Sequence, residues 1–271
     1  MRAAAILVSA LCASCSYPGS VREGAGTPNR LRVCADPSAP PLSDRNETGL
    51  ENRLASLIAR DLALPLEYTY WPQRRDFLRN TIRAKRCDVV MGVPEGFDAL
   101  LTTRPYYRSS YVFVQPASLD PPLRSFDDPR LGSLRIGVQL VGDDGFDTPP
   151  VHALVRRGLA DRLIGFPVQR DRLEKGTRST IVTALDRGEL DAAVVWGPAA
   201  AFYARTVTRP LRLEPVATAP GDPPMRFAIS VGVARSAKTL HARIDEALLR
   251  RQPQIAELLG DPAATQTEPI R

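Results

Sequence analysis

The stretch CDVVMGVPEGFDALLTTRPYY (87–107) decides the fold. It begins with a short run of apolar residues, passes into a loop rich in Gly and Pro, and ends in a group of polar and aromatic residues. A strand that is apolar throughout is buried on both faces, which is typical of a parallel sheet covered by helices. The stretch therefore predicts a buried strand that delivers a binding loop.

The segments before this strand predict a parallel sheet. Residues 31–37 and 66–71 have the pattern of strands, and residues 49–65 that of an amphipathic helix with Pro65 just past its end. Residues 71–86 (WPQRRDFLRNTIRAKR) predict a second amphipathic helix. An alternation of strand, helix, strand, helix and strand indicates right-handed parallel connections.

The second half of the chain repeats this plan. FLRNTIRAKRCDVVMGVP (77–94) and IVTALDRGELDAAVVWGP (181–198) both read as a helix, a tight turn, an Asp, an apolar strand, and then Gly and Pro. We expect an α/β protein with two lobes, each a mostly parallel sheet flanked by helices, and hinges near 113–118 and 214–228. The expected boundaries are 30–115 plus 228–260 for lobe 1, 118–214 for lobe 2, and 261–271 for a tail.

The N-terminus MRAAAILVSALCASCS (1–16) has the features of a secretory signal, and residues 17–29 read as a linker. No later segment is apolar for 18 residues, so we do not expect a transmembrane protein. Cys15 loosely fits a lipoprotein cleavage box, but Cys12 stands where Leu is usual. Export is therefore expected, and lipidation of Cys15 stays open.

Two cysteines, Cys34 and Cys87, remain after the signal region. In an oxidising compartment they favour one disulfide between neighbouring strands, with two buried thiols as the alternative.

Composition and motifs argue against two classes of function. The net charge of +6 comes from arginines scattered among acids, without a basic stripe or zinc-finger spacing, so nucleic acid is not an expected partner. The only histidines are His152 and His241, and no G-x-S-x-G, H-E-x-x-H or phosphate loop occurs. We expect neither an enzyme nor a bound cofactor or metal.

The chain resembles the extracytoplasmic solute-binding proteins of the polar amino-acid transporter group (family 3) over about residues 30–260. The pieces that carry this resemblance are LRVCADPSAPPL, GLENRLASLIARDLAL, CDVVMGVP, RPYYRSSYVFV and ALDRGELDAAVVW. Within that group the long run from Trp71 to Val114 is most similar to the quinoprotein-dehydrogenase-associated binding proteins, which are encoded beside periplasmic methanol dehydrogenases. The resemblance implies a type II periplasmic-binding-protein fold.

The chain departs from the amino-acid carriers at both charged anchors. Those carriers usually have an Arg in the loop after the third strand, whose planar fork binds the ligand carboxylate. Here that loop is GVPEGFDAL (92–100), without Arg, and Trp196-Gly197-Pro198 stands where an acid usually binds the ligand amino group. Since an unpaired charge in a closed cleft costs several kcal/mol, we do not expect an amino-acid ligand.

The loops at the carboxyl ends of the predicted strands supply the candidate residues of the interlobe cleft. They are Asp36, Leu42, Glu51, Asn52, Trp71, Arg74, Val93, Pro94, Phe97, Arg104, Gln139, Thr180 and Trp196. For the two tryptophans core packing is an equal alternative, and for Arg104 an ion pair or surface role is the alternative.

The resemblance implies an exported accessory of a quinoprotein methanol or alcohol dehydrogenase, the enzyme that carries pyrroloquinoline quinone. The dehydrogenase, with its cytochrome c as a further candidate, is the expected partner, and the cleft would bind a protein segment or a cofactor-like ligand. The alternative is a receptor that delivers a small solute other than an amino acid to an ABC transporter.

Overall fold

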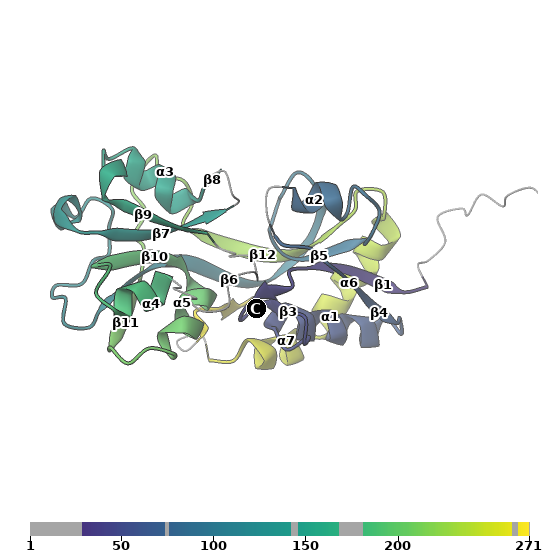
Figure 1. Cartoon of the computed structure of the whole chain (residues 1–271). Coiled ribbons are helices and arrows are strands. Elements are labelled where there is room, and N and C mark those ends of the chain that lie inside the picture. Colours follow the sequence, from purple (N-terminus) through teal and green to yellow (C-terminus); the bar gives the residue numbers. More distant parts are fainter. Residues whose placement is uncertain (1–28, 74–75, 142–145, 168–180, 262–264, 271) are drawn as a thin grey trace, which may run out of the picture.

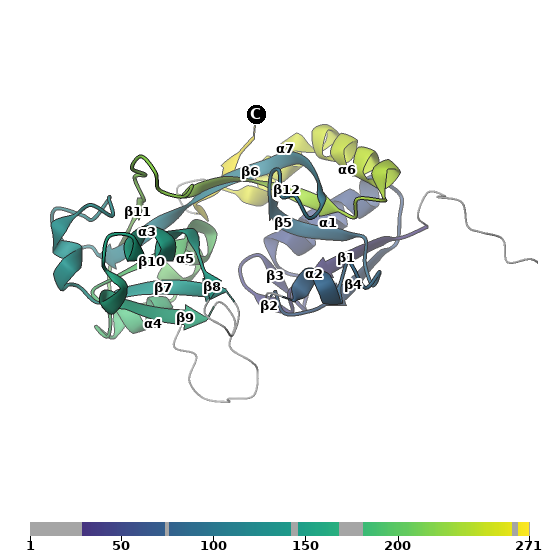
Figure 2. The same ribbon diagram turned by 90° about the horizontal axis from the view of Figure 1, so that it is seen from above.

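A computed structural model describes residues 29–73, 76–141, 146–167, 181–261 and 265–270 (Figure 1). The predicted signal peptide, nearly all of the predicted linker, Cys15, Arg74 and Thr180 lie outside the described residues. Two lobes lie side by side and are joined by long strands that run through both (Figure 2).

The first lobe is built on a sheet with strands in the order β4–β1–β5–β12, in which β1 pairs in parallel with both β4 and β5. The apolar residues at helical spacing in 49–65 are all buried in the core of this lobe: Leu54, Leu57, Ile58 and Leu62. The elements of this lobe are β1 (Leu31–Ala35), β2 (Ser38–Ala39), β3 (Ser43–Asp44), α1 (Leu50–Asp61), β4 (Leu66–Tyr70), α2 (Phe77–Asn80), β5 (Val89–Pro94), β12 (Arg226–Val233), α6 (Lys238–Arg250) and α7 (Gln252–Leu259).

The second lobe repeats the parallel arrangement, with β7 pairing in parallel with β9 and β10. Its core is formed by buried residues of these strands and of the helices that cover them. Its elements are the 3-10 helix η1 (Pro129–Ser133), β7 (Ile136–Val141), β8 (Phe146–Asp147), α3 (Pro149–Val155), the 3-10 helix η2 (Ala160–Arg162), β9 (Leu163–Pro167), α4 (Ile181–Asp186), β10 (Ala192–Trp196), α5 (Gly197–Ala204) and β11 (Leu211–Pro215). The two-lobed α/β fold with mostly parallel sheets is the predicted one.

Strand β6 (Leu101–Pro116) belongs to both lobes. It pairs with β12 of the first lobe as far as Ser110, and from Tyr111 onward it pairs with β10 of the second lobe. On the return path the Tyr111 amide donates a hydrogen bond of 2.8 Å to the Met225 carbonyl oxygen. The chain thus changes lobe near residues 110–111 and again near 216–225.

The sequence repeat corresponds to a repeated polar contact. The Arg32 guanidinium donates to both oxygens of Asp88, and Arg135 binds Asp191 in the same way. In each pair the Asp amide also donates to the carbonyl oxygen of the arginine. Each lobe therefore fixes the start of its buried strand by an Arg–Asp pair from the neighbouring strand.

The expected disulfide forms between Cys34 of β1 and Cys87 just before β5, with a Cα–Cα distance of 5.6 Å. Both side chains are buried. The bridge adds a covalent link between two neighbouring parallel strands.

The helix predicted for residues 71–86 is wrong over most of its length. Of the described residues in this range, Phe77–Asn80 alone form a helix, and turns follow over residues 81–85. The Asn80 side chain donates to the Asp76 carbonyl oxygen, and the Thr81 hydroxyl donates to that of Phe77. Such local side-chain bonds offer the backbone an alternative to a regular helix, which explains the early end.

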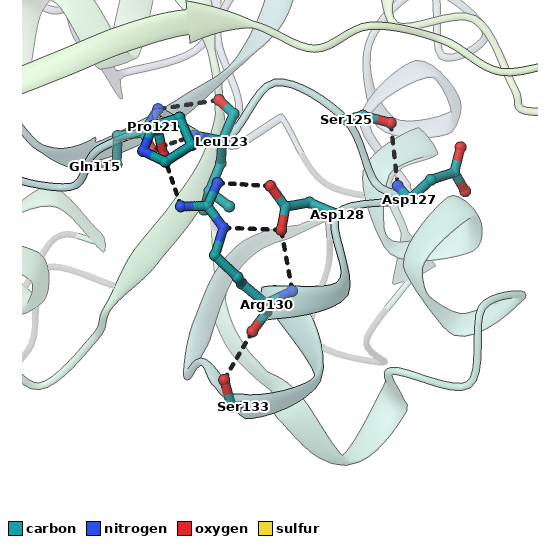
Figure 3. Close-up of polar contacts among 8 residues, drawn as sticks. All are labelled: Gln115, Pro121, Leu123, Ser125, Asp127, Asp128, Arg130 and Ser133. Atoms are coloured by element: carbon teal, nitrogen blue, oxygen red, sulfur yellow. Dashed lines mark hydrogen bonds and ion pairs between the residues drawn. The ribbon is translucent and has the colours of Figure 1, made fainter.

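The segment that enters the second lobe after β6 is held by polar contacts (Figure 3). The Gln115 side chain exchanges two hydrogen bonds with the backbone of Leu123. Arg130 binds both oxygens of Asp128 and donates to the Pro121 carbonyl oxygen at 2.7 Å. These contacts give a defined conformation to an irregular connection of the second lobe.

Candidate functional site at the junction of the lobes

Glu51, in the first turn of α1, is the central residue of the candidate site. Its half-buried side chain lies against Gly92 of β5, where a Cβ atom would come 2.1 Å from Glu51 Oε1. Among the described residues, no hydrogen-bond donor pairs with its carboxylate. Burial, together with the charge of Asp36, raises the pKa of Glu51 to about 7.

Two tyrosines of β6 lie close to this carboxylate. The Tyr106 hydroxyl oxygen accepts a hydrogen bond of 3.2 Å from the Gly92 amide, and that of Tyr107 accepts one from the Trp196 side chain. Burial raises the pKa of both phenols, and the charge of Glu51 adds to this effect. Both hydroxyls therefore stay protonated at neutral pH.

An aromatic cluster continues the site toward the second lobe. The Trp196 ring centroid lies 5.3 Å from that of Tyr111 and 6.1 Å from that of Phe227. Trp196 ends β10 of the second lobe, yet it packs against the core of the first. Its backbone amide donates to the Gln139 side-chain oxygen at 2.9 Å, which joins the ends of β10 and β7. We call the set Glu51, Gly92, Tyr106, Tyr107, Tyr111, Trp196 and Phe227 the junction site.

Asp36 contributes charge to the junction site but uses its oxygens elsewhere. One oxygen accepts from the Ser38 amide and the other from the Gln73 amide, both at 2.7 Å. The buried carboxylate therefore fixes the loops that follow β1 and β4.

Arg104 does not fit the candidate role of ligand clamp. Its guanidinium and its backbone amide bind the carboxylate of Asp245 on α6, with the shortest contact at 2.6 Å. The ion pair that the sequence left as an alternative is what the structure contains, because Arg104 lies near the start of β6, beside Asp245 of α6.

Asn52 faces away from its neighbour Glu51. Its side-chain oxygen accepts from the Asp44 amide, while its buried Nδ2 atom has no partner among the described residues. Asn52 lines an open groove of about 540 Å³ between α1 and α7, together with Arg53, Arg60 and Glu257. The two adjacent candidates therefore belong to different surfaces.

The remaining candidates lie around the first lobe. Trp71 packs against the cluster that contains the disulfide, and the Arg86 guanidinium lies 5.6 Å from its ring centroid. Leu42 packs against the main core, and Val93 is buried. Pro94 and Phe97 are exposed at the end of β5 and in the loop that follows it.

Sequence reasoning missed the tyrosines and Phe227 as site residues. Tyr106 and Tyr107 stand in the stretch 87–107, and the low aromatic content of 6% made a group of aromatics at a strand end informative. The contact of Tyr107 with Trp196 joins residues far apart in the chain, which no local pattern reveals.

No group of three or more metal-ligating side chains occurs within the part of the chain that the structure describes. The helices of that part include none long and apolar enough to span a membrane. The junction site can instead offer the Glu51 carboxyl group, whose pKa is raised to about 7 and which lies near the buried Tyr106 and Tyr107, beside the half-buried rings of Tyr111, Trp196 and Phe227. Such a surface suits an apolar or flat group that carries a hydrogen-bond donor or a positive charge.

The fold and the lobe junction define the class of the protein as a two-lobed periplasmic binding protein. MxaJ from Methlophaga aminisulfidivorans superposes with a TM-score of 0.74 at 25% identity, covering 89% of this chain and all of that one. The periplasmic binding protein XoxJ from Methylobacterium extorquens AM1 gives a TM-score of 0.68 at 29% identity, with coverage of 89% and 99%.

Sequence similarity gives the family. The chain is 31% identical to protein MoxJ of Methylorubrum extorquens over 258 residues, which cover 89% of this chain and 82% of MoxJ. The chain belongs to the MoxJ family. No family model matches it.

Proposed function

We propose that this protein is an exported, non-catalytic accessory of a periplasmic methanol or alcohol dehydrogenase that carries pyrroloquinoline quinone. In this proposal the junction site binds a segment of the immature enzyme or a cofactor-like ligand. The observation that carries the proposal is membership of the MoxJ family over nearly the whole chain.

The composition of the junction site supports a guest other than a free amino acid. The loop 92–100 contains no Arg, and Arg104 is engaged by Asp245. Neither of these two positions offers a cation to a ligand carboxylate, and an amino acid bound without one would bury an unpaired charge. Aromatic side chains such as Trp196 and Tyr111 are instead typical of the centres of protein interfaces.

Binding to the immobilised apo-dehydrogenase, loaded with neither quinone nor metal, tests the proposal. We expect a complex at micromolar concentrations, and Trp196→Ala should weaken it roughly 30-fold because a central aromatic anchor contributes about 2 kcal/mol. Leu249→Ala, at an exposed position of α6, is the matched control and should bind like the wild type. Absence of a complex with the wild type would contradict the proposal.

A thermal-shift screen of amines, organic acids and quinone cofactors separates the proposal from a transport receptor. A small ligand present at 100 to 1,000 times its Kd would stabilise the protein by about 3–4 kcal/mol. A strong shift with a small solute, together with no complex with the apo-dehydrogenase, would favour the transport receptor.

A further inference from the structure

The C-terminal tail returns to the point where the two lobes meet. After α7 the chain forms β13 (Glu268–Pro269), which pairs with Arg108 and Tyr107 of β6. On β6 these residues precede Tyr111, the residue at which the pairing with β10 of the second lobe ends, and Ser109 and Ser110 lie between them. In Figure 2 the tail lies along β6 on the side away from β8 and β2.

The tail is fastened to the first lobe. The Thr265 hydroxyl donates to the Asp261 carbonyl oxygen at 2.8 Å. The buried Thr267 hydroxyl donates to the carbonyl oxygen of Leu259 in α7 at 3.4 Å. Pro269 and Ile270 line a small pocket together with Tyr106 and α7 residues such as Ile255. These contacts make the tail move with the first lobe.

The tail also meets the second lobe. At the end of the first-lobe part of β6, the Ser109 hydroxyl donates to the Gln266 carbonyl oxygen at 2.5 Å and holds the tail beside the start of α5. Gly197, the first residue of α5, lies close to both Ser109 and the tail. A Cβ atom at this position would lie 2.8 Å from Ser109 Oγ and 2.9 Å from the Cβ of Gln266. The first turn of α5 therefore rests on the tail, with no room for a methyl group between them.

We propose that the C-terminal tail (265–270) is a strap that limits the angle between the lobes. A rotation of the second lobe about residues 109–111 moves Gly197 relative to Gln266, while the contacts with α7 hold Gln266 on the first lobe. The strap adds a third connection to the two chain crossings and narrows the range of hinge motion. This inference rests on the fold and not on the proposed function.

Distances between the lobes, measured by electron paramagnetic resonance, test the strap. Spin labels on cysteines at the exposed positions Arg83 and Glu189 report the separation of the lobes, while Cys34 and Cys87 are blocked in their disulfide and Cys12 and Cys15 of the signal region are replaced by Ser. A chain that ends at Gly260 should give a distance distribution roughly twice as broad as that of the full chain, because hinge motion is freed.

A single added methyl group tests the same contact in the full-length chain. Gly197→Ala forces α5 and the tail apart and should shift the mean distance between the lobes. Gly132→Ala, at a glycine of the second lobe with open space around it, is the matched control and should leave the distribution unchanged. If the distance distribution of Gly197→Ala matches that of the wild type, the proposal is overturned. This test does not depend on whether the chain that ends at Gly260 folds.

Discussion

At the scale of the residue, Glu51 is a carboxyl group whose burial changes its protonation near neutral pH. A carboxylate in the first turn of a helix is ordinarily stabilised by the helix dipole, which favours the charged form. Burial beside Gly92 and the charge of Asp36 outweigh this effect and raise the pKa of Glu51 to about 7. The carboxyl group therefore takes up a proton on folding near pH 6, so the folded state binds more protons than the unfolded one.

This difference predicts a loss of stability with rising pH. The contribution of Glu51 is present in full below pH 4.5, the unfolded value, and is lost as the pH rises to about 7. The upper bound of this loss is about 3 kcal/mol. Urea unfolding at pH 5 and pH 8 should show a smaller fall in stability for Glu51→Gln than for the wild type. Glu95→Gln, at an exposed position, is the control, and an equal fall in all three proteins would contradict the prediction.

At the scale of the element, the repeated Arg–Asp pairs fix the two buried strands β5 and β10. Both Asp residues, Asp88 and Asp191, belong to the repeated sequence plan, in which each precedes an apolar strand; their partners are Arg32 in β1 and Arg135 directly before β7. The pattern of apolar strands and turns predicted these elements because it is local. The helix expected at 71–86 failed because Asn80 and Thr81 bond back to the backbone, a competition that apolar periodicity does not show.

The ion pairs Arg32–Asp88 and Arg135–Asp191 are expected to contribute unequally to the free energy of unfolding. Asp88→Asn should lower the free energy of unfolding by about 1 kcal/mol and Asp191→Asn by less, because exposed ion pairs are the weaker ones. The side chain of Asp88 is 22% exposed and that of Asp191 35%. Glu189→Gln, whose ion pair with Arg187 is longer and more exposed, is the control and should change little. Chemical unfolding measures all three, and a larger loss for Asp191→Asn than for Asp88→Asn would contradict this ranking.

At the scale of the whole molecule, β6 unites the two lobes and carries three tyrosines of the junction site, Tyr106, Tyr107 and Tyr111. The sequence predicted the two-lobed fold because each lobe consists of short, regular units. The residues that meet at the junction, Glu51, Tyr107 and Trp196, are far apart in the chain, so only part of the site could be predicted. The pairing of the tail with β6 was not predicted either, because β13 is too short to leave a periodic pattern.

Photo-crosslinking to the apo-dehydrogenase tests the central claim, that the protein receives its partner at the junction of the lobes. A photoreactive amino acid at Phe97 is compared with the same group at Leu249 on α6. Phe97 lies in the exposed loop after β5, which begins beside the junction site because the Glu95 amide donates to the carbonyl oxygen of Ala228, the neighbour of Phe227. The two side chains are similarly exposed, at 40% and 49%, so accessibility alone does not separate them. We predict a crosslink to the dehydrogenase from position 97 and none from position 249. Crosslinking from position 249 alone would contradict the account.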